Sequence, residues 1–213
     1  NIHVRGRKLT EDVGIMGVGC STPTPFGTPS EYPDSQLAVW LAEAYDQVLN
    51  PGGAMDVAQR ALRDGRIRHI GITSHSLDVT RKAVASGHFE MILYPLNCVN
   101  NEAEEKLLPL RRERDVGFVA MKPFAGGRLG DADLVVKYLL QFGDVVAVPG
   151  IERLEEIDQM LTIARDNRGL KGEDLNRIAR IRSELGGKFC QWCGYCMPVC
   201  PQEIYIPACS TSR

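Results

Sequence analysis

The sequence predicts an α/β fold built around a parallel β-sheet, and two observations lead to this class. Four short apolar segments each precede a segment with helical periodicity, and these pairs recur at intervals of roughly 25 to 30 residues. The apolar segments lack alternating polar residues, which is typical of strands buried on both faces. Parallel strands need crossovers of this length, so the repeat favours an open doubly wound sheet or part of a (β/α)8 barrel.

The expected elements follow in a regular order. Residues 13–19 could form a short strand, and residues 20–34 are too rich in Pro, Gly, Ser and Thr for regular structure. Helices are expected from Ser35 to about Val48, from about Ala54 to Arg63, and over residues 171–187. We expect four strands, adjacent, parallel and in sequence order, at residues 67–73, 91–97, 117–123 and 145–151.

Composition sets broad limits on function. The chain has 213 residues, of which 44% are hydrophobic and 24% charged, enough for a sizeable core. A net charge of -2 gives no basic field for nucleic acid, and no apolar run is long enough to predict a membrane span. The chain opens at Asn1 without a signal-peptide pattern, and we expect a cytoplasmic location. The expected division is an unassigned segment at 1–50, an α/β unit at 51–187 and a cysteine tail at 188–213.

The tail reads "FCQWCGYCMPVCP", a C-x2-C-x2-C-x3-C-P run formed by Cys190, Cys193, Cys196 and Cys200. This spacing is typical of [4Fe-4S] ligands in bacterial ferredoxins, because closely spaced thiolates can wrap one iron-sulfur cube. A zinc site would more often show two separated C-x2-C pairs, and disulfides would be unusual inside a cell. The run therefore predicts a [4Fe-4S] cluster, with zinc or a disulfide as alternatives. Cys200 is the favoured fourth ligand, and the distant Cys209 is the other candidate.

Three further motifs precede the cysteine run: "GGAMDVAQRALRDGRIRHIGITSH", "MKPFAGGRL" and "VPGIERLEEIDQM". In this order they resemble the aldo/keto reductase family, in particular its bacterial and archaeal branch with a C-terminal iron-sulfur motif. The resemblance implies a TIM-barrel type (β/α)8 fold, of which only strands 5–8 are recognisable, with a C-terminal iron-sulfur tail. The family's catalytic Asp, Tyr, Lys and His lie on strands 1–4. No matching motif occurs before Tyr45, so no catalytic residue is assigned.

The same resemblance implies a nicotinamide site at the ends of these four strands. The glycines of "FAGGRL" would let backbone N–H groups approach a diphosphate, beside a helix N-terminus, although a tight turn without a ligand has the same sequence signature. The candidate cofactor-binding residues are Thr73, Ser74, Asn97, Lys122, Phe124, Ala125, Gly126, Gly127, Gly150 and Arg153.

The last strand end departs from the family pattern. Glu152 stands where the family has an Arg, and Met160 stands where it has an Asn. An acidic side chain repels a 2′-phosphate by roughly 1 kcal/mol at an exposed effective dielectric, so we expect weak or absent NADP preference unless Arg153 compensates. His75 is interpreted as a loop histidine and Cys98 as a small buried residue.

These features predict an iron-sulfur oxidoreductase that passes a hydride between NADP or NAD and a small carbonyl compound. The alternative is a non-catalytic electron-transfer or structural subunit built on a degenerate reductase barrel. A redox partner protein or a second chain is a possible partner in either case, and neither nucleic acid nor a membrane is expected.

Overall fold

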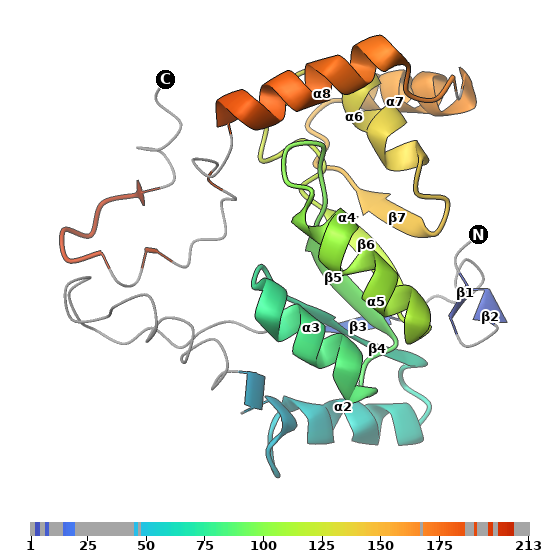
Figure 1. Ribbon diagram of the computed structural model, residues 1–213. Helices are drawn as coiled ribbons and strands as arrows, with labels where there is room; N and C mark the ends of the chain where they lie inside the picture. The colour runs from blue at the N-terminus through green and yellow to red at the C-terminus, as the bar shows by residue number, and fades with distance from the viewer. Residues whose placement is uncertain are drawn as a thin grey trace.

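The computed structural model describes residues 3–4, 7–8, 15–19, 45–46, 48–166, 168–185, 190, 196–197 and 200–206. Its central feature is a five-stranded parallel sheet with the strand order β3-β4-β5-β6-β7 (Figure 1). The strands are β3 Ile15–Gly19, β4 His69–Thr73, β5 Met91–Pro95, β6 Gly117–Met121 and β7 Val145–Val148. Two short strands, β1 His3–Val4 and β2 Arg7–Lys8, form a separate antiparallel pair that the sequence did not indicate.

The predicted order and direction of the four repeat strands are confirmed. β4, β5, β6 and β7 are adjacent and parallel, in sequence order. The strand expected at 13–19 is also confirmed as β3, and it extends the same sheet by pairing in parallel with β4. The sequence did not predict this pairing, because a long stretch of chain separates the two strands.

The helices agree with the periodicity, with one exception. The structure has α2 Ala54–Arg63, α3 Leu77–Ser86, α6 Ala132–Leu140, α7 Leu154–Asp166 and α8 Gly172–Leu185. The segment after β5 forms two helices, α4 Glu102–Lys106 and α5 Leu108–Glu113, rather than one continuous helix. Pro109 explains the break, because proline has no N–H to donate to the preceding turn. Of the helix expected from Ser35, only the end at Tyr45–Leu49 lies partly within the described residues, and it is helical there.

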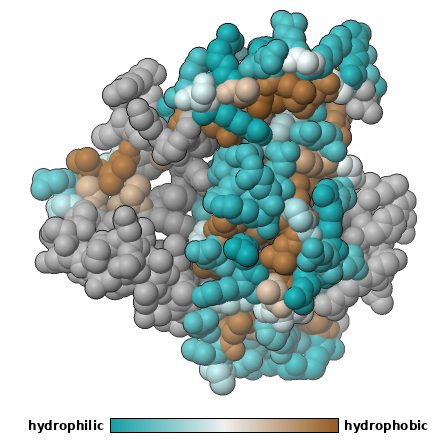
Figure 2. Space-filling model, in the orientation of Figure 1, coloured by the Kyte–Doolittle hydropathy of each residue, from teal (hydrophilic) through white to brown (hydrophobic). Residues whose placement is uncertain are grey.

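One face of the sheet packs against helices. Ile72, Ile92 and Phe118 are register neighbours on β4, β5 and β6, and they are 2%, 0% and 0% exposed. Tyr94 lies on the same face of β5, and its hydroxyl donates to the α4 residue Glu102. We call this the helix-covered face; α3 and α5 lie in front of it in Figure 1. The outer surface of these helices is mostly hydrophilic in Figure 2, as expected for amphipathic helices over a core.

The opposite face of the sheet is apolar and less covered. It carries Leu93, Val119 and Val146, which are register neighbours across β5, β6 and β7. Leu93 and Val119 are half-buried, whereas Val146 and Val148 on β7 are 42% and 52% exposed. The expectation that all four strands are buried on both faces is therefore wrong for β7. The reason is its position, because among the described residues β7 pairs only with β6 and forms an edge of the sheet.

None of the described helices combines the length and the apolar character that crossing a bilayer requires.

Candidate functional site

The carboxyl ends of β4 to β7 all meet at one edge of the sheet. This follows from the parallel register, which pairs Thr73 with Leu93, Pro95 with Met121, and Met121 with Val148. In parallel α/β sheets and barrels, ligands bind at this edge, where the loops after the strands converge. The ten residues proposed for the nicotinamide site all lie at or just beyond these four strand ends.

The end of β4 is shaped by three successive serine and histidine positions. Ser74 is 4% exposed; its backbone N–H donates to the Leu93 carbonyl at 3.3 Å, and its Oγ accepts from the Ser76 N–H at 3.0 Å. Ser76 in turn caps α3 by accepting from the Val79 N–H at 3.4 Å. The Ser74 side chain therefore helps to turn the chain from strand to helix. Its hydroxyl group can still donate a hydrogen bond to a ligand.

His75 lies next to Ser74 and has an unusual environment for a loop histidine. Burial, with a smaller contribution from the nearby positive charge of Lys122, lowers the pKa of His75 to about 4. The imidazole is therefore neutral at pH 7, and it lies close enough to Lys122 to feel its charge. The sequence did not single out His75 as a site residue, since a lone histidine after a strand carries no spacing signal.

Asn97 ties the ends of two strands together. The side chain is 2% exposed, and its Oδ1 accepts from the backbone N–H groups of Val99 at 3.1 Å and Asn100 at 3.0 Å. Its Nδ2 donates to the carbonyl of Lys122 at 3.3 Å. These bonds use most of the amide's capacity and hold the β5–α4 loop against the end of β6.

The loop after β6 has a backbone that is unusually rich in left-handed conformations. Lys122, Ala125, Gly126 and Gly127 have φ values of 52°, 56°, 67° and 84°. Such values are easy for glycine and costly for other residues, so Lys122 and Ala125 store strain that the surrounding structure must offset. Strain of this kind is concentrated at functional sites, which favours a ligand site over an ordinary tight turn.

Several N–H groups of this loop are already used. Those of Ala125 and Gly127 donate to carbonyls within the loop, at 2.9 and 3.0 Å. The N-terminus of α6 is also filled, because the Asp131 carboxylate accepts from the Leu134 N–H at 3.0 Å. A phosphate at this loop would therefore lie against the exposed Gly126 and Gly127 rather than at the first turn of α6. Arg128, which the sequence search did not select, adds a positive charge at the same place.

The loop after β7 and the first turn of α7 are mostly exposed and together carry more acidic than basic residues. The Arg153 side chain is 74% exposed and is held by Glu156, with Nε 3.1 Å from Oε1. The other Glu156 oxygen accepts from the Glu152 N–H at 2.9 Å, which satisfies the start of α7. This backbone bond, followed by the Arg153 guanidinium, lowers the pKa of Glu156. A nucleotide phosphate would have to compete with Glu156 for Arg153.

The cysteine run is described only in part. Cys190, Cys196 and Cys200 are partly exposed, whereas Cys193, Cys20 and Cys209 lie outside the described residues. Within the described part, which omits Cys193, no three His, Cys, Asp or Glu side chains are grouped so as to hold a metal. The backbone turns at Cys200, whose N–H donates to the Met197 carbonyl and whose carbonyl accepts from Glu203. The donor set itself, closely spaced soft thiols, suits iron and sulfide.

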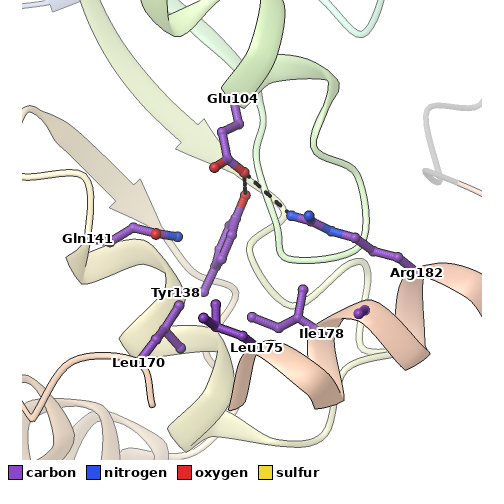
Figure 3. Close-up of a pocket in the computed structure, with 8 residues that line it drawn as sticks. Glu104, Tyr138, Gln141, Leu170, Leu175, Ile178 and Arg182 are labelled. Atoms are coloured by element: carbon purple, nitrogen blue, oxygen red, sulfur yellow. Dashed lines mark hydrogen bonds and ion pairs between the residues drawn. The ribbon is translucent and has the colours of Figure 1, made fainter. Parts of the chain in front are cut away.

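A pocket of about 370 Å³ lies beneath α8, away from the strand ends (Figure 3). It is lined by Glu104, Tyr138, Gln141, Leu170, Leu175, Ile178, Ala179 and Arg182. The Tyr138 hydroxyl donates to Glu104 Oε2 at 2.8 Å, and Arg182 lies 3.4 Å from the same oxygen. Burial, and then the bond to Glu104, raise the pKa of Tyr138 well above its usual range. Hydrophobic side chains gather under α8 in Figure 2. Glu104, Tyr138 and Arg182 interact with one another in the pocket wall.

The structure defines the chain as an α/β protein with a parallel sheet, and the candidate residues lie at the carboxyl edge of that sheet. Residues 35–134 match the model of the aldo/keto reductase family. No curated protein matches the sequence.

Solved structures agree with this fold. An aldo/keto reductase from Klebsiella pneumoniae in complex with NADP and acetate has 18% identity and a TM-score of 0.51, over 80% of this chain and 70% of that chain. An aldo-keto reductase from a Medee basin deep-sea metagenome library has 11% identity and a TM-score of 0.51, over 73% and 68%. A second Klebsiella pneumoniae aldo-keto reductase, in complex with NADPH, has 19% identity and a TM-score of 0.48, over 58% of this chain. The match spans 51% of that protein's length. At such identities, the two matches with TM-scores above 0.5 identify a fold.

Proposed function

We propose that this chain is an iron-sulfur oxidoreductase of the aldo/keto reductase type, which transfers a hydride between a nicotinamide cofactor and a small carbonyl compound. The observation that carries the proposal is the convergence of strand-end residues at one edge of a parallel sheet whose sequence matches the family over residues 35–134. The strained loop after β6 and the neutral His75 support it, since both are features of ligand sites rather than of ordinary turns.

The proposed nucleotide path follows the strand ends in order. The nicotinamide amide would contact Thr73, Ser74 and Asn97 at the ends of β4 and β5. The diphosphate would lie over Lys122 and the loop of residues 124–127, where two exposed glycines allow close approach. The adenosine end would reach Gly150 and Arg153 beyond β7.

When bound, a reduced nicotinamide would supply the hydride for reduction of a carbonyl carbon, and a proton would be needed at the carbonyl oxygen. This chain's own proposed part is to hold the nucleotide at the sheet edge. The groups that would deliver the proton are not assigned to any residue.

The second proposed group is a [4Fe-4S] cluster held by Cys190, Cys193, Cys196 and Cys200, with Cys209 as the alternative fourth ligand. The support is the spacing of the four cysteines together with the soft donor character of their thiolates. When bound, such a cluster supplies one-electron transfer. Trp192 and Tyr195, between the ligands, would limit its contact with water.

A nucleotide titration tests the first part. The full chain should bind NADPH and NADH with similar affinity, because Glu152 stands where a 2′-phosphate would be read and Arg153 is paired with Glu156. Replacing Glu152→Gln should strengthen NADPH binding about five-fold relative to NADH, which corresponds to roughly 1 kcal/mol. Nicotinamide fluorescence provides the readout. Glu155→Gln, a neighbouring exposed carboxylate, is the matched control and should change the ratio little. Failure to bind either nucleotide would refute the proposal.

Metal analysis tests the second part. Anaerobically purified protein should be brown, absorb near about 400 nm and hold about four irons per chain. Cys193→Ser should abolish the colour, whereas Cys209→Ser should retain it. A colourless protein with stoichiometric zinc would contradict the cluster, and colour lost with Cys209 but kept without Cys200 would reassign the fourth ligand.

The acidic loop after β7 favours one alternative. If Glu152 and Glu156 repel a phosphate from this position, the chain would be an electron-transfer or structural subunit that does not bind a nucleotide. A chain that holds the cluster, binds neither NADPH nor NADH and accepts electrons from a reductant would support this reading.

A further inference from the structure

The helix that leads into the cysteine tail is attached to two loops of the proposed nucleotide site. α8 ends at Leu185, a few residues before Cys190, and it lies across the outer helices in Figure 1. Two of its arginines, Arg177 and Arg182, reach side chains or carbonyls on other elements. The Arg182 contact lies beside Asn97, which is proposed to bind the nucleotide, and the Arg177 contact lies at the end of the loop that contains Gly126 and Gly127.

Arg182 holds the loop after β5. Its Nε donates to the carbonyl of Cys98 at 2.8 Å, and its NH2 lies 3.4 Å from Glu104, which also accepts from the Tyr138 hydroxyl. Cys98 is 0% exposed and directly follows Asn97. The loop is therefore held on one side by Asn97, which bonds to Lys122, and on the other by the Arg182 guanidinium.

Arg177 holds the loop after β6. It forms an ion pair with Asp131, the residue that caps the N-terminus of α6. Asp131 follows the strained loop of residues 122–129 by only two positions, so the Arg177 contact fixes the place where that loop ends. Figure 3 shows Arg182 beside Glu104 in the wall of the α8 pocket. Together with the ion pair between Arg177 and Asp131, this contact makes α8 a common support for both loops.

We propose that Arg182 and Arg177 are positioning residues through which α8 holds two loops of the nucleotide site. The inference rests on the proposed function, because it assigns a role towards the same nucleotide. Loss of either contact should loosen the loop that it holds and weaken nucleotide binding.

The experiment compares Arg182→Gln with Arg182→Lys and with Arg180→Gln in the full chain purified anaerobically. Arg180 is the matched control, because it is an exposed α8 arginine for which the structure gives no side-chain contact. We expect Arg182→Gln to speed amide hydrogen exchange at Val99 and Asn100 about ten-fold. It should also raise the Kd of the better-bound nucleotide about five- to ten-fold. Arg182→Lys keeps the charge near Glu104 and should recover part of both effects. Arg180→Gln should change neither.

Arg177→Gln provides an independent test if Arg182→Gln folds poorly, and it should weaken the Kd by a similar factor. Faster exchange with an unchanged Kd would overturn the inference, since Arg182 would then be structural only. Unchanged exchange in Arg182→Gln would also overturn it. Failure of the wild type to bind any nucleotide would instead refute the proposed function.

Discussion

Polar side chains at the strand ends are largely engaged by the fold itself. Asn97 bonds to three backbone groups, Ser74 to the start of α3, and Arg153 to Glu156. A residue type that suits a ligand is thus equally suited to closing a turn, because both roles need the same donors and acceptors. The sequence could locate these residues, but their free hydrogen-bonding capacity is decided by neighbours that only the structure supplies.

His75 makes stability depend on pH. Its pKa is about 4 in the folded protein against 6.5 ordinarily, so the unfolded chain takes up the proton first as pH falls. The stabilisation from a neutral His75 is therefore fully present above about pH 6.5 and is lost as pH falls towards about 4. The free energy of unfolding of the wild type should therefore fall over this pH window, and His75→Gln should make this fall smaller by about 1 kcal/mol. This value is reduced to allow for the partial exposure of the ring. Urea unfolding at about pH 7 and about pH 5 measures it.

His88→Gln is the control for this prediction, because His88 is exposed. His88→Gln should leave the fall in the free energy of unfolding on acidification the same as in the wild type. Equal effects of the two substitutions would show that the environment of His75 contributes nothing specific.

At the scale of elements, most boundaries have local causes. α3 begins at Ser76 and α6 at Asp131, and each residue caps its helix by accepting a backbone N–H. α3 ends at Gly87, whose φ of 73° suits a glycine C-cap. Such signals lie within a few residues of the boundary, which is why the periodicity placed most of these helices correctly. The break between α4 and α5 at Pro109 was equally local and was visible in the sequence.

The pairing of β4 with β5 depends on a glycine. A Cβ on Gly71 would lie 2.4 Å from Met91 Cγ and 3.1 Å from the Met91 carbonyl oxygen. Gly71→Ala should therefore force Met91 and the strand to shift, and should lower the free energy of unfolding by about 1–3 kcal/mol. Gly143→Ala, where no atom lies within 4 Å of the added Cβ, should change it by less than about 0.5 kcal/mol. Urea denaturation of both variants provides the comparison. An equal loss of unfolding free energy in the two variants would contradict a steric clash with Met91 as the cause.

At the scale of the whole molecule, the two faces of the sheet differ. The helix-covered face is closed, with Ile92 and Phe118 at 0% exposure, whereas β7 leaves Val146 and Val148 open. α7 has no buried residue within its span and does not close this part of the sheet. An apolar edge strand is a site where another chain can add on.

This edge should drive association of the protein. Val148→Lys should weaken concentration-dependent self-association at least about ten-fold, because a charge would be placed in an apolar contact. Sedimentation velocity over a concentration series gives the measurement. Val57→Lys on α2 is matched, since Val57 is 53% exposed against 52% for Val148. A wild type that stays monomeric throughout, or two variants that behave alike, would exclude β7 as the contact.

The sequence by itself determined the repeat of strands and helices, the order of the parallel strands and the cysteine spacing. These are properties of periodicity and short-range chemistry, which residues within one turn or one strand already express. Only the tertiary structure decided that β3 joins the same sheet, that β7 is exposed, that His75 is neutral beside Lys122, and that Arg177 and Arg182 attach α8 to two loops. Those features depend on groups far apart in the chain, whose approach is set by packing and desolvation rather than by any local pattern.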